Sequence, residues 1–401
     1  MDFLVTATTF LKSLRSKFRE ISYLAGPAEA TPEGTTVFLG KDALAPRIFE
    51  QVANDAIEAD RTFLGLLLFK GVLENAPSLF PNLSSENFQR LQHYTLDTLE
   101  NNDNYVELTY YALACNDLGK TQALVEENIR SRGRKAPDHD QLLLEVVLDN
   151  PILFPGLKSL PNLQQQQYKD GLNFNFNLGQ MVQCENLPYN LFSTANVPRK
   201  SKALRLLAEV YDFAGVLGHV NWKSSIVMND INCDLFLHAI DAILAEDNTA
   251  DEEIARNVYT NYIRYRAKKC GLEHEPLFYL FGRIAGLSRA TDFNSGKLIV
   301  NVWNKLSSHT QQILLTEMLL DGFQRKAILI YYFPAVITNA IKATGDFTAG
   351  LGIALEKVAD VYQMTRKQLT YNGISNEPGV YTVNVSNLAK KMNSLERIIT
   401  T

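Results

Sequence analysis

The amino-acid sequence predicts a mainly α fold, a compact multi-helix bundle with only a few short strands. In two long stretches, residues 43–131 and 202–365, apolar side chains recur at the spacing of amphipathic helices. Strand and helix patterns do not alternate repeatedly, as they would in a parallel α/β sheet. The chain has 401 residues, of which 46% are hydrophobic and 21% charged. This is the composition of a globular protein with about two to three domains.

Residues 1–25 form the first predicted element, an N-terminal amphipathic helix. Its apolar side chains include Phe3, Phe10 and Leu14, and basic side chains such as Lys12 and Arg15 lie around the other side. One interpretation is a helix that lies on a membrane surface or acts as a targeting segment. The other is a helix docked on the body of the protein.

Residues 26–149 are predicted to form a helical domain. A Pro/Gly/Thr-rich stretch beginning at Gly26 should be a loop. Ser84 provides a hydroxyl for an N-cap before one helix. The helices are expected at residues 43–56, 58–76, 84–101, 104–116 and 119–131.

Residues 150–200 differ in composition, and we expect an irregular loop or lid rich in Pro, Asn and Gln. A run of glutamines spans residues 164–167, and prolines interrupt both ends of the stretch. A long loop of this kind in a compact protein is usually functional or mobile.

Helical patterns resume over residues 201–401, which we expect to pack on the first domain as one continuous body. The apolar run that starts at Ala327 is too short to span a bilayer and is broken by Pro334, so it predicts a buried, kinked helix. Alternating residues predict brief strands at 297–302 and 381–385. Helices are expected at 202–217, 231–246, 251–269, 275–287, 309–323, 325–342 and 347–365.

The net charge and the cysteine positions argue against several classes of function for this protein. A formal net charge of −5 disfavours a nucleic-acid binder, and no transmembrane segment is predicted. Cys115, Cys184, Cys233 and Cys270 are too far apart for a zinc ribbon or a thioredoxin-type site, so buried thiols are expected. No signal peptide is evident, and the sequence therefore predicts a cytoplasmic protein.

Three segments contain the residues that suggest a chemical function for this chain. They contain His93, the stretch ALACNDLGK that ends at Lys120, and His139 between two aspartates. The middle stretch resembles the HD-domain superfamily, whose motif is a His-Asp dyad followed by Gly-Lys on one of several successive helices. The resemblance covers residues 93–219 and departs at the dyad histidine, where this chain has Asn116.

The resemblance implies a helical phosphohydrolase-like enzyme that uses a metal-activated water on a phosphate ester or related small molecule. His93, Asp117 and His139 would be metal ligands, Asp212 or His219 would complete the set, and Asp117 and Lys120 would be catalytic. Lys120 would meet an anionic group of the substrate.

Asn116 weakens the metal site that the resemblance implies, because an amide oxygen is a poor ligand for transition metals. We therefore expect at most one divalent transition-metal ion per chain. Changing Asn116 to His should raise metal affinity if the other ligands are in place.

A second interpretation is a non-catalytic helical protein, derived from such a fold, that binds a ligand or partner. In this interpretation residues 117–120 are a helix terminus with a glycine turn, and Asp138 is an N-cap. Cys115 is either a nucleophile or a core residue. Tyr259, Tyr262 and the aromatic residues at 278–281 either wall a pocket for a small molecule or belong to the core.

Overall fold

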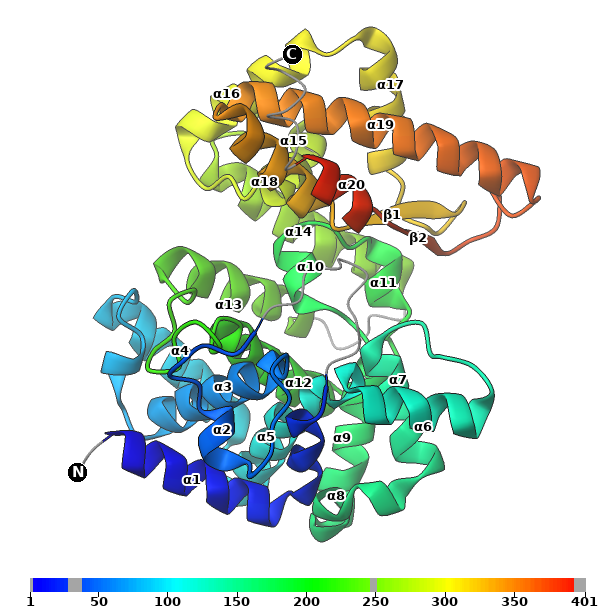
Figure 1. Ribbon diagram of the computed structural model, residues 1–401. Coiled ribbons are helices and arrows are strands. Elements are labelled where there is room, and N and C mark those ends of the chain that lie inside the picture. Colours follow the sequence, from blue (N-terminus) through cyan, green and yellow to red (C-terminus); the bar gives the residue numbers. More distant parts are fainter. Residues whose placement is uncertain (1–2, 28–37, 246–250, 393–401) are drawn as a thin grey trace. The chain divides into compact units, whose positions relative to one another are not determined.

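The computed structural model confirms the predicted fold class, because it is mainly α-helical with two short strands among the described residues. It describes residues 3–27, 38–245 and 251–392 (Figure 1). The chain divides into two compact units. Unit 1 comprises residues 1–175 and 197–240, and unit 2 comprises residues 176–196 and 241–401.

Unit 1 is a helical bundle in which α3 packs against α12, and α12 in turn packs against α5 and α9. Side-chain caps begin several of its helices, including the predicted cap of α4 by Ser84 and that of α7 by Asp138. Its helices are α1 (Phe3–Lys17), η1 (Arg19–Ala25), α2 (Ala45–Ile48), α3 (Ile57–Leu73), η2 (Pro77–Leu79), α4 (Ser85–Leu99), α5 (Asp103–Cys115), η3 (Asn116–Lys120), α6 (Gln122–Arg132), α7 (His139–Asp149), η4 (Pro151–Leu153), α8 (Pro155–Ser159), α9 (Asn162–Phe174), α12 (Arg199–Gly215) and the first part of α13 (Asp230–Leu244).

Glycines let α3 and α12 approach closely. A Cβ on Gly65 would lie 3.0 Å from the carbonyl oxygen of Tyr211, and a Cβ on Gly215 would lie 2.7 Å from the backbone nitrogen of Gly65. Larger side chains at these positions would push the helices apart. The close crossing brings polar residues of α3 and α12 within reach of each other.

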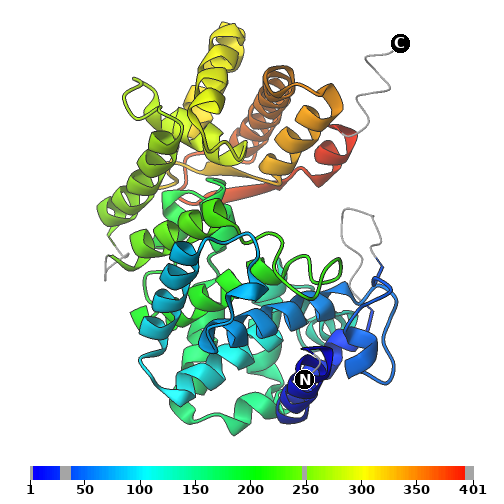
Figure 2. The ribbon, with the colours of Figure 1, turned by 90° about the vertical axis from the view of Figure 1, so that its left-hand side faces the viewer.

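The N-terminal helix α1 is docked on unit 1, as Figures 1 and 2 show. Ala7, Leu11 and Leu14 are buried, whereas Lys12 and Lys17 are exposed. The structure therefore agrees with the docked interpretation of residues 3–17. None of the helices in the described parts of the chain has the length and apolar character needed to cross a membrane.

Residues 150–200 are largely helical, which differs from the irregular loop that the prolines and amides predicted. The prolines begin η4, α8 and α11 (Pro188–Phe192) instead of interrupting helices, a position that suits proline because a first-turn N–H needs no partner. The buried carboxylate of Glu20 accepts hydrogen bonds from the backbone nitrogens of Gly156 and Leu157 and so holds α8 against η1. The part of the segment that contains α8 is thus packed within unit 1.

Unit 2 has its own apolar core around α15, α16, α18 and α19, together with a two-stranded parallel sheet. In the sheet Ala327 pairs with Val380, and Tyr331 pairs with Asn384. The elements of this unit are α10 (Leu178–Val182), α11, the end of α13, α14 (Glu252–Lys269), α15 (Phe278–Leu287), α16 (Phe293–Lys305), α17 (Ser308–Met318), β1 (Ala327–Tyr331), α18 (Phe333–Thr344), α19 (Phe347–Tyr371), β2 (Val380–Asn384) and α20 (Ser386–Met392).

The predicted strand at 381–385 is confirmed as β2, but two other predictions in this unit are wrong. Residues 297–302 belong to helix α16. The apolar run from Ala327 is a strand followed by a helix, because Tyr332 adopts φ +74° between β1 and α18. Pro334 lies in the first turn of α18, where it begins the helix instead of kinking it.

We predict that Gly119→Ala destabilises unit 1. The added Cβ would lie 2.0 Å from the backbone carbonyl oxygen of His139, so η3 and α7 would have to separate, at a cost of about 3 kcal/mol. Urea unfolding measures this loss. The control is Gly352→Ala in the interior of α19, where the nearest atom is 3.9 Å away, so the unfolding free energy should rise by about 0.5–1 kcal/mol. An unfolding free energy of Gly119→Ala equal to that of the wild type would contradict the close packing of η3 on α7.

Candidate functional site

Asp117 and Lys120, both on η3, form the centre of a charged cluster in unit 1. The Lys120 Nζ atom lies 2.6 Å from Asp117 Oδ1 and 3.4 Å from Glu58 Oε2 of α3. The side chain of Asp117 is only 2% exposed, whereas one third of the Lys120 side chain reaches solvent. A single ammonium group therefore contacts two acidic side chains from different helices.

Burial and neighbouring charges separate the pKa values of the acidic groups. Burial raises the pKa of Glu58 to about 7, and the charge of Asp117 adds to this rise. Burial and the charge of Asp117 also raise the pKa of Asp212, on α12, to about 7. Burial alone would raise the pKa of Asp117, but the Lys120 ammonium and a hydrogen bond with Glu58 hold it well below its ordinary value. Asp117 is therefore the permanent anion of the cluster.

Lys120 stays charged in this environment. Burial alone would lower its pKa, but the carboxylates of Asp117, Glu58 and Asp212 together raise it above the ordinary value for lysine. The ammonium thus lies where several acidic groups from three elements meet.

A second cation, Arg205 of α12, is buried and binds the polar groups beside this centre. Its Nη1 atom donates to Asn116 Oδ1 at 2.5 Å, and its Nη2 atom donates to Asp140 Oδ1 at 3.1 Å. Its Nε atom donates to Glu209 Oε1 at 3.1 Å. Asn116, at the position of the expected dyad histidine, is therefore a hydrogen-bond acceptor for a guanidinium group.

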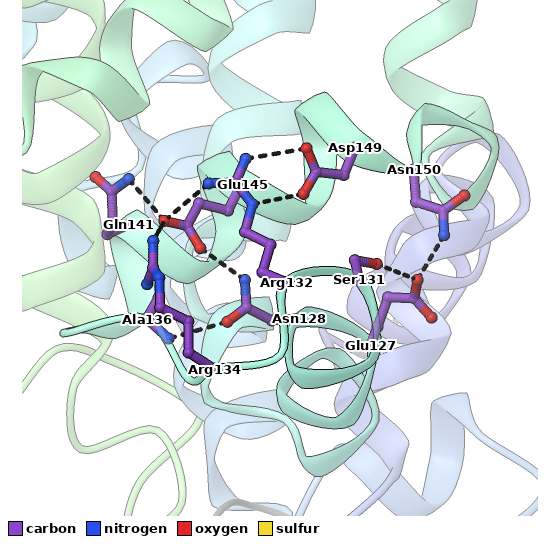
Figure 3. A network of polar contacts seen from close by, with 10 residues as sticks. All are labelled: Glu127, Asn128, Ser131, Arg132, Arg134, Ala136, Gln141, Glu145, Asp149 and Asn150. Carbon is purple, nitrogen blue, oxygen red and sulfur yellow. Dashed lines mark hydrogen bonds and ion pairs between the residues drawn. The ribbon is translucent and has the colours of Figure 1, made fainter.

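A polar network joins α6 to α7, the helix that carries His139 and Asp140 (Figure 3). The buried carboxylate of Glu145 accepts hydrogen bonds from Asn128 and Arg134, both at 2.8 Å, and lies 3.1 Å from Arg132 Nη1. Asn128 also accepts a hydrogen bond from the backbone nitrogen of Ala136. These contacts join α6, the linking segment and α7 into one piece.

Arg61 and two histidines lie at the edge of the cluster. Arg61 donates from Nη1 to Glu58 Oε1 at 2.7 Å and from Nε to His219 Nδ1 at 3.4 Å. His139 Nε2 is 3.7 Å from Asp140 Oδ1, and His139 contributes to lowering the pKa of Asp117. Both histidines are partly exposed.

The structure brings together several residues that the sequence analysis singled out, but not all of them. Asp117, Lys120 and Asp212 form the cluster, with His139 beside it, and His219 is linked to it through Arg61. His93 does not converge with them, because its side chain is 79% exposed on α4 and its Nε2 atom lies 3.1 Å from Asp97 Oδ2.

Sequence reasoning missed Glu58, Arg61 and Arg205. The signal that could have found them is charge within apolar helices. Glu58 and Arg61 precede the most apolar part of α3, and Arg205 lies between buried leucines of α12. Charged groups at such positions are expected to be paired.

The donor set does not fit the metal ion that the resemblance implies. Within residues 3–27, 38–245 and 251–392, no group of three or more His, Cys, Asp or Glu side chains is arranged to hold a metal. Asp117 is bound by Lys120 and Glu58, and Asn116 is bound by Arg205. The Lys120 ammonium thus contacts the carboxylate of the expected dyad, and the Arg205 guanidinium contacts the residue at the expected histidine position.

A match to a protein-family model shows which family the chain belongs to. The model of a family of unknown function, DUF6829, matches residues 29–396. The chain belongs to the DUF6829 family. No curated protein and no solved structure gives a significant match.

The other chemical candidates of this DUF6829 chain lie in its apolar cores. Cys115 is fully buried, and burial raises its pKa well above that of an ordinary thiol, so it is not an activated nucleophile. Tyr259 and Tyr262 are also fully buried, and their hydroxyl groups donate to the carbonyl oxygens of Asn186 and Val182. The four cysteines are buried and free, as expected.

We predict that Glu58→Gln flattens the pH dependence of stability. Because folding raises the pKa of Glu58 from 4.5 to about 7, its protonated form stabilises the fold. This contribution is complete below about pH 4.5 and is lost as the pH rises through 7. The unfolding free energy of the wild type should therefore fall between pH 5 and 8, and that of Glu58→Gln should fall less, by on the order of 2 kcal/mol.

Urea unfolding at each pH measures this difference, with exposed Glu126→Gln as the control. Identical slopes for the wild type and Glu58→Gln would contradict the raised pKa.

Proposed function

We propose that this protein is a non-catalytic helical protein that binds a small ligand, and that its HD-like cluster is a structural centre neutralised by its own side chains. The observation that carries the proposal is the position of the Lys120 ammonium, 2.6 Å from Asp117 and 3.4 Å from Glu58. A carboxylate paired with an internal ammonium needs no metal to compensate its charge.

Arg205 supports the same proposal from the opposite side of the motif. Its guanidinium binds Asn116 and Asp140 together. A histidine at position 116 would lose the amide oxygen that accepts this bond and would gain a cationic neighbour, which disfavours a further cation. The proposal therefore predicts that Asn116→His leaves metal affinity low, because Asp117 is already paired with Lys120.

One observation favours a second candidate function, the phosphate-ester hydrolase that the resemblance implies. Glu58 and Asp212 have pKa values of about 7, which suit groups that donate or accept protons at neutral pH. Arg61, at the edge of the cluster, could meet an anionic substrate. Such an enzyme would need Glu58 or Asp212 for turnover, whereas the binding protein would need them only for stability.

Removal of the Lys120 ammonium tests the proposal. We predict that Lys120→Ala lowers the unfolding free energy by about 2 kcal/mol at pH 8, because Asp117 and its acidic neighbours lose their cation. Millimolar MnCl2 should restore part of the thermal stability of Lys120→Ala but leave the wild type unchanged, since Mn²⁺ accepts carboxylate ligands and the vacated position lies between them. The measurement is thermal unfolding with and without MnCl2.

The matched control is the double variant Lys120→Ala/Asp117→Asn, which should not respond to Mn²⁺ because the permanent anion is gone. Hydrolysis of generic phosphodiester and nucleotide substrates is measured on the same samples. One tightly bound metal ion per wild-type chain, with turnover that Glu58→Gln or Asp212→Asn abolishes, would overturn the proposal in favour of the hydrolase.

A further inference from the structure

We propose that a groove between α1 and the end of α3 binds an anionic amphiphile with one carboxylate and a linear apolar tail, such as a medium-chain fatty acid. This inference names the ligand class of the proposed binding function. The groove has a volume of about 460 Å³, which lies within the range of roughly 300–1,000 Å³ found for small-molecule sites. It is separate from the charged cluster, with which it shares no residue.

The walls of the groove are apolar faces of two helices. Phe3, Ala7 and Phe10 are spaced along one face of α1, and Leu67 and Gly71 lie on one face of α3. The remaining lining residues are Thr6, Lys70, Glu74, Ala76, Ser78, Leu79 and Lys223. A linear hydrocarbon tail is suited to a trough of this kind.

Gly71 and Leu79 both line the groove. A Cβ on Gly71 would lie 2.3 Å from Leu79 Cδ1, so a larger residue would require the end of the Leu79 side chain to move. Leu79 supplies apolar surface to the same groove as Phe3 and Phe10.

The charges that line the groove favour a ligand of negative charge. Lys70 pairs with Glu74, and its ammonium lies 5.6 Å from the centre of the Phe10 ring. Lys223 has no acidic partner among the lining residues, and its ammonium lies 5.9 Å from the ring of Trp222. The lining therefore carries a net charge of about +1, which matches a single carboxylate.

An aromatic stack lies beside Lys223. The rings of Phe3 and Trp222 are stacked with an interplanar angle of 1° and centroids 5.8 Å apart. Trp222 is 6% exposed, whereas Phe3 is 43% exposed, so the stack extends from the body of the protein to the surface. A tail that packs against Phe3 would place its head group next to Lys223.

Calorimetric titration of the full-length chain with sodium dodecanoate, below its micellar concentration, tests the inference. We predict saturable binding of one dodecanoate per chain, with affinity falling about fourfold for each methylene removed from the tail. Dodecyltrimethylammonium should bind at least tenfold more weakly than dodecanoate, because its head group has the wrong sign. Trp222 fluorescence should change on dodecanoate binding.

Two variants locate the site. Lys223→Met should weaken dodecanoate binding about tenfold by removing the ammonium, and Thr6→Trp should abolish it by filling the groove from the exposed side of α1. Lys12→Met, an exposed position of α1 outside the groove, is the control and should bind normally.

No binding of dodecanoate, equal binding of the cationic amphiphile, or binding that both groove variants leave unchanged would overturn the inference. Each of these results would argue against a fatty-acid ligand in the groove. None of them would change the expected response of Lys120→Ala to Mn²⁺, so failure of this inference can be told apart from failure of the proposed charge centre. Both groove variants retain Asp117, Lys120 and their partners, and a change in their Mn²⁺ response would show disturbed folding instead of a lost ligand.

Discussion

The ion pair between Lys120 and Asp117 is the interaction on which the organisation of unit 1 depends. Asp117 is almost completely buried, and an unpaired carboxylate at that position would be strongly destabilising. The Lys120 ammonium lies close enough to serve Asp117 and Glu58 together and raises its own pKa by doing so. Three segments that are distant in sequence, α3, η3 and α12, therefore contribute to one electrostatic balance.

The arrangement of these charges requires that the backbones of neighbouring helices approach each other very closely. Gly65 and Gly215 let α3 and α12 cross closely, and Gly119 lets η3 approach the first turn of α7. The Glu145 network then holds α7 against α6. Since each approach leaves no room for a larger side chain, the positions of Glu58, Asp212 and Asp140 around η3 are consequences of packing. The raised pKa values of Glu58 and Asp212 follow from the same burial.

Sequence patterns predicted the fold class and the centre of the cluster, but not its periphery. Helical spacing revealed most helices, and the local motif led to Asp117 and Lys120. The spacing of His93 did not show whether its side chain faces the cluster or solvent. Helical spacing tells which residues share a face of the helix, but not what that face contacts. Arg205 and Glu58 join the cluster through tertiary contacts across more than one helix. Strand β1 was read as helix because its partner β2 is far away in sequence, and a short apolar run fits both structures.

A crystal structure of the wild-type protein grown with millimolar MnCl2, with anomalous scattering recorded for manganese, tests the central claim most directly. The claim is that Lys120 takes the place of a metal ion among Asp117, Glu58 and Asp212. It predicts no anomalous peak within ligand distance of Asp117 and continuous density for Lys120 directed at Asp117 Oδ1. A manganese peak bound to Asp117, with the Lys120 side chain turned away, would contradict it.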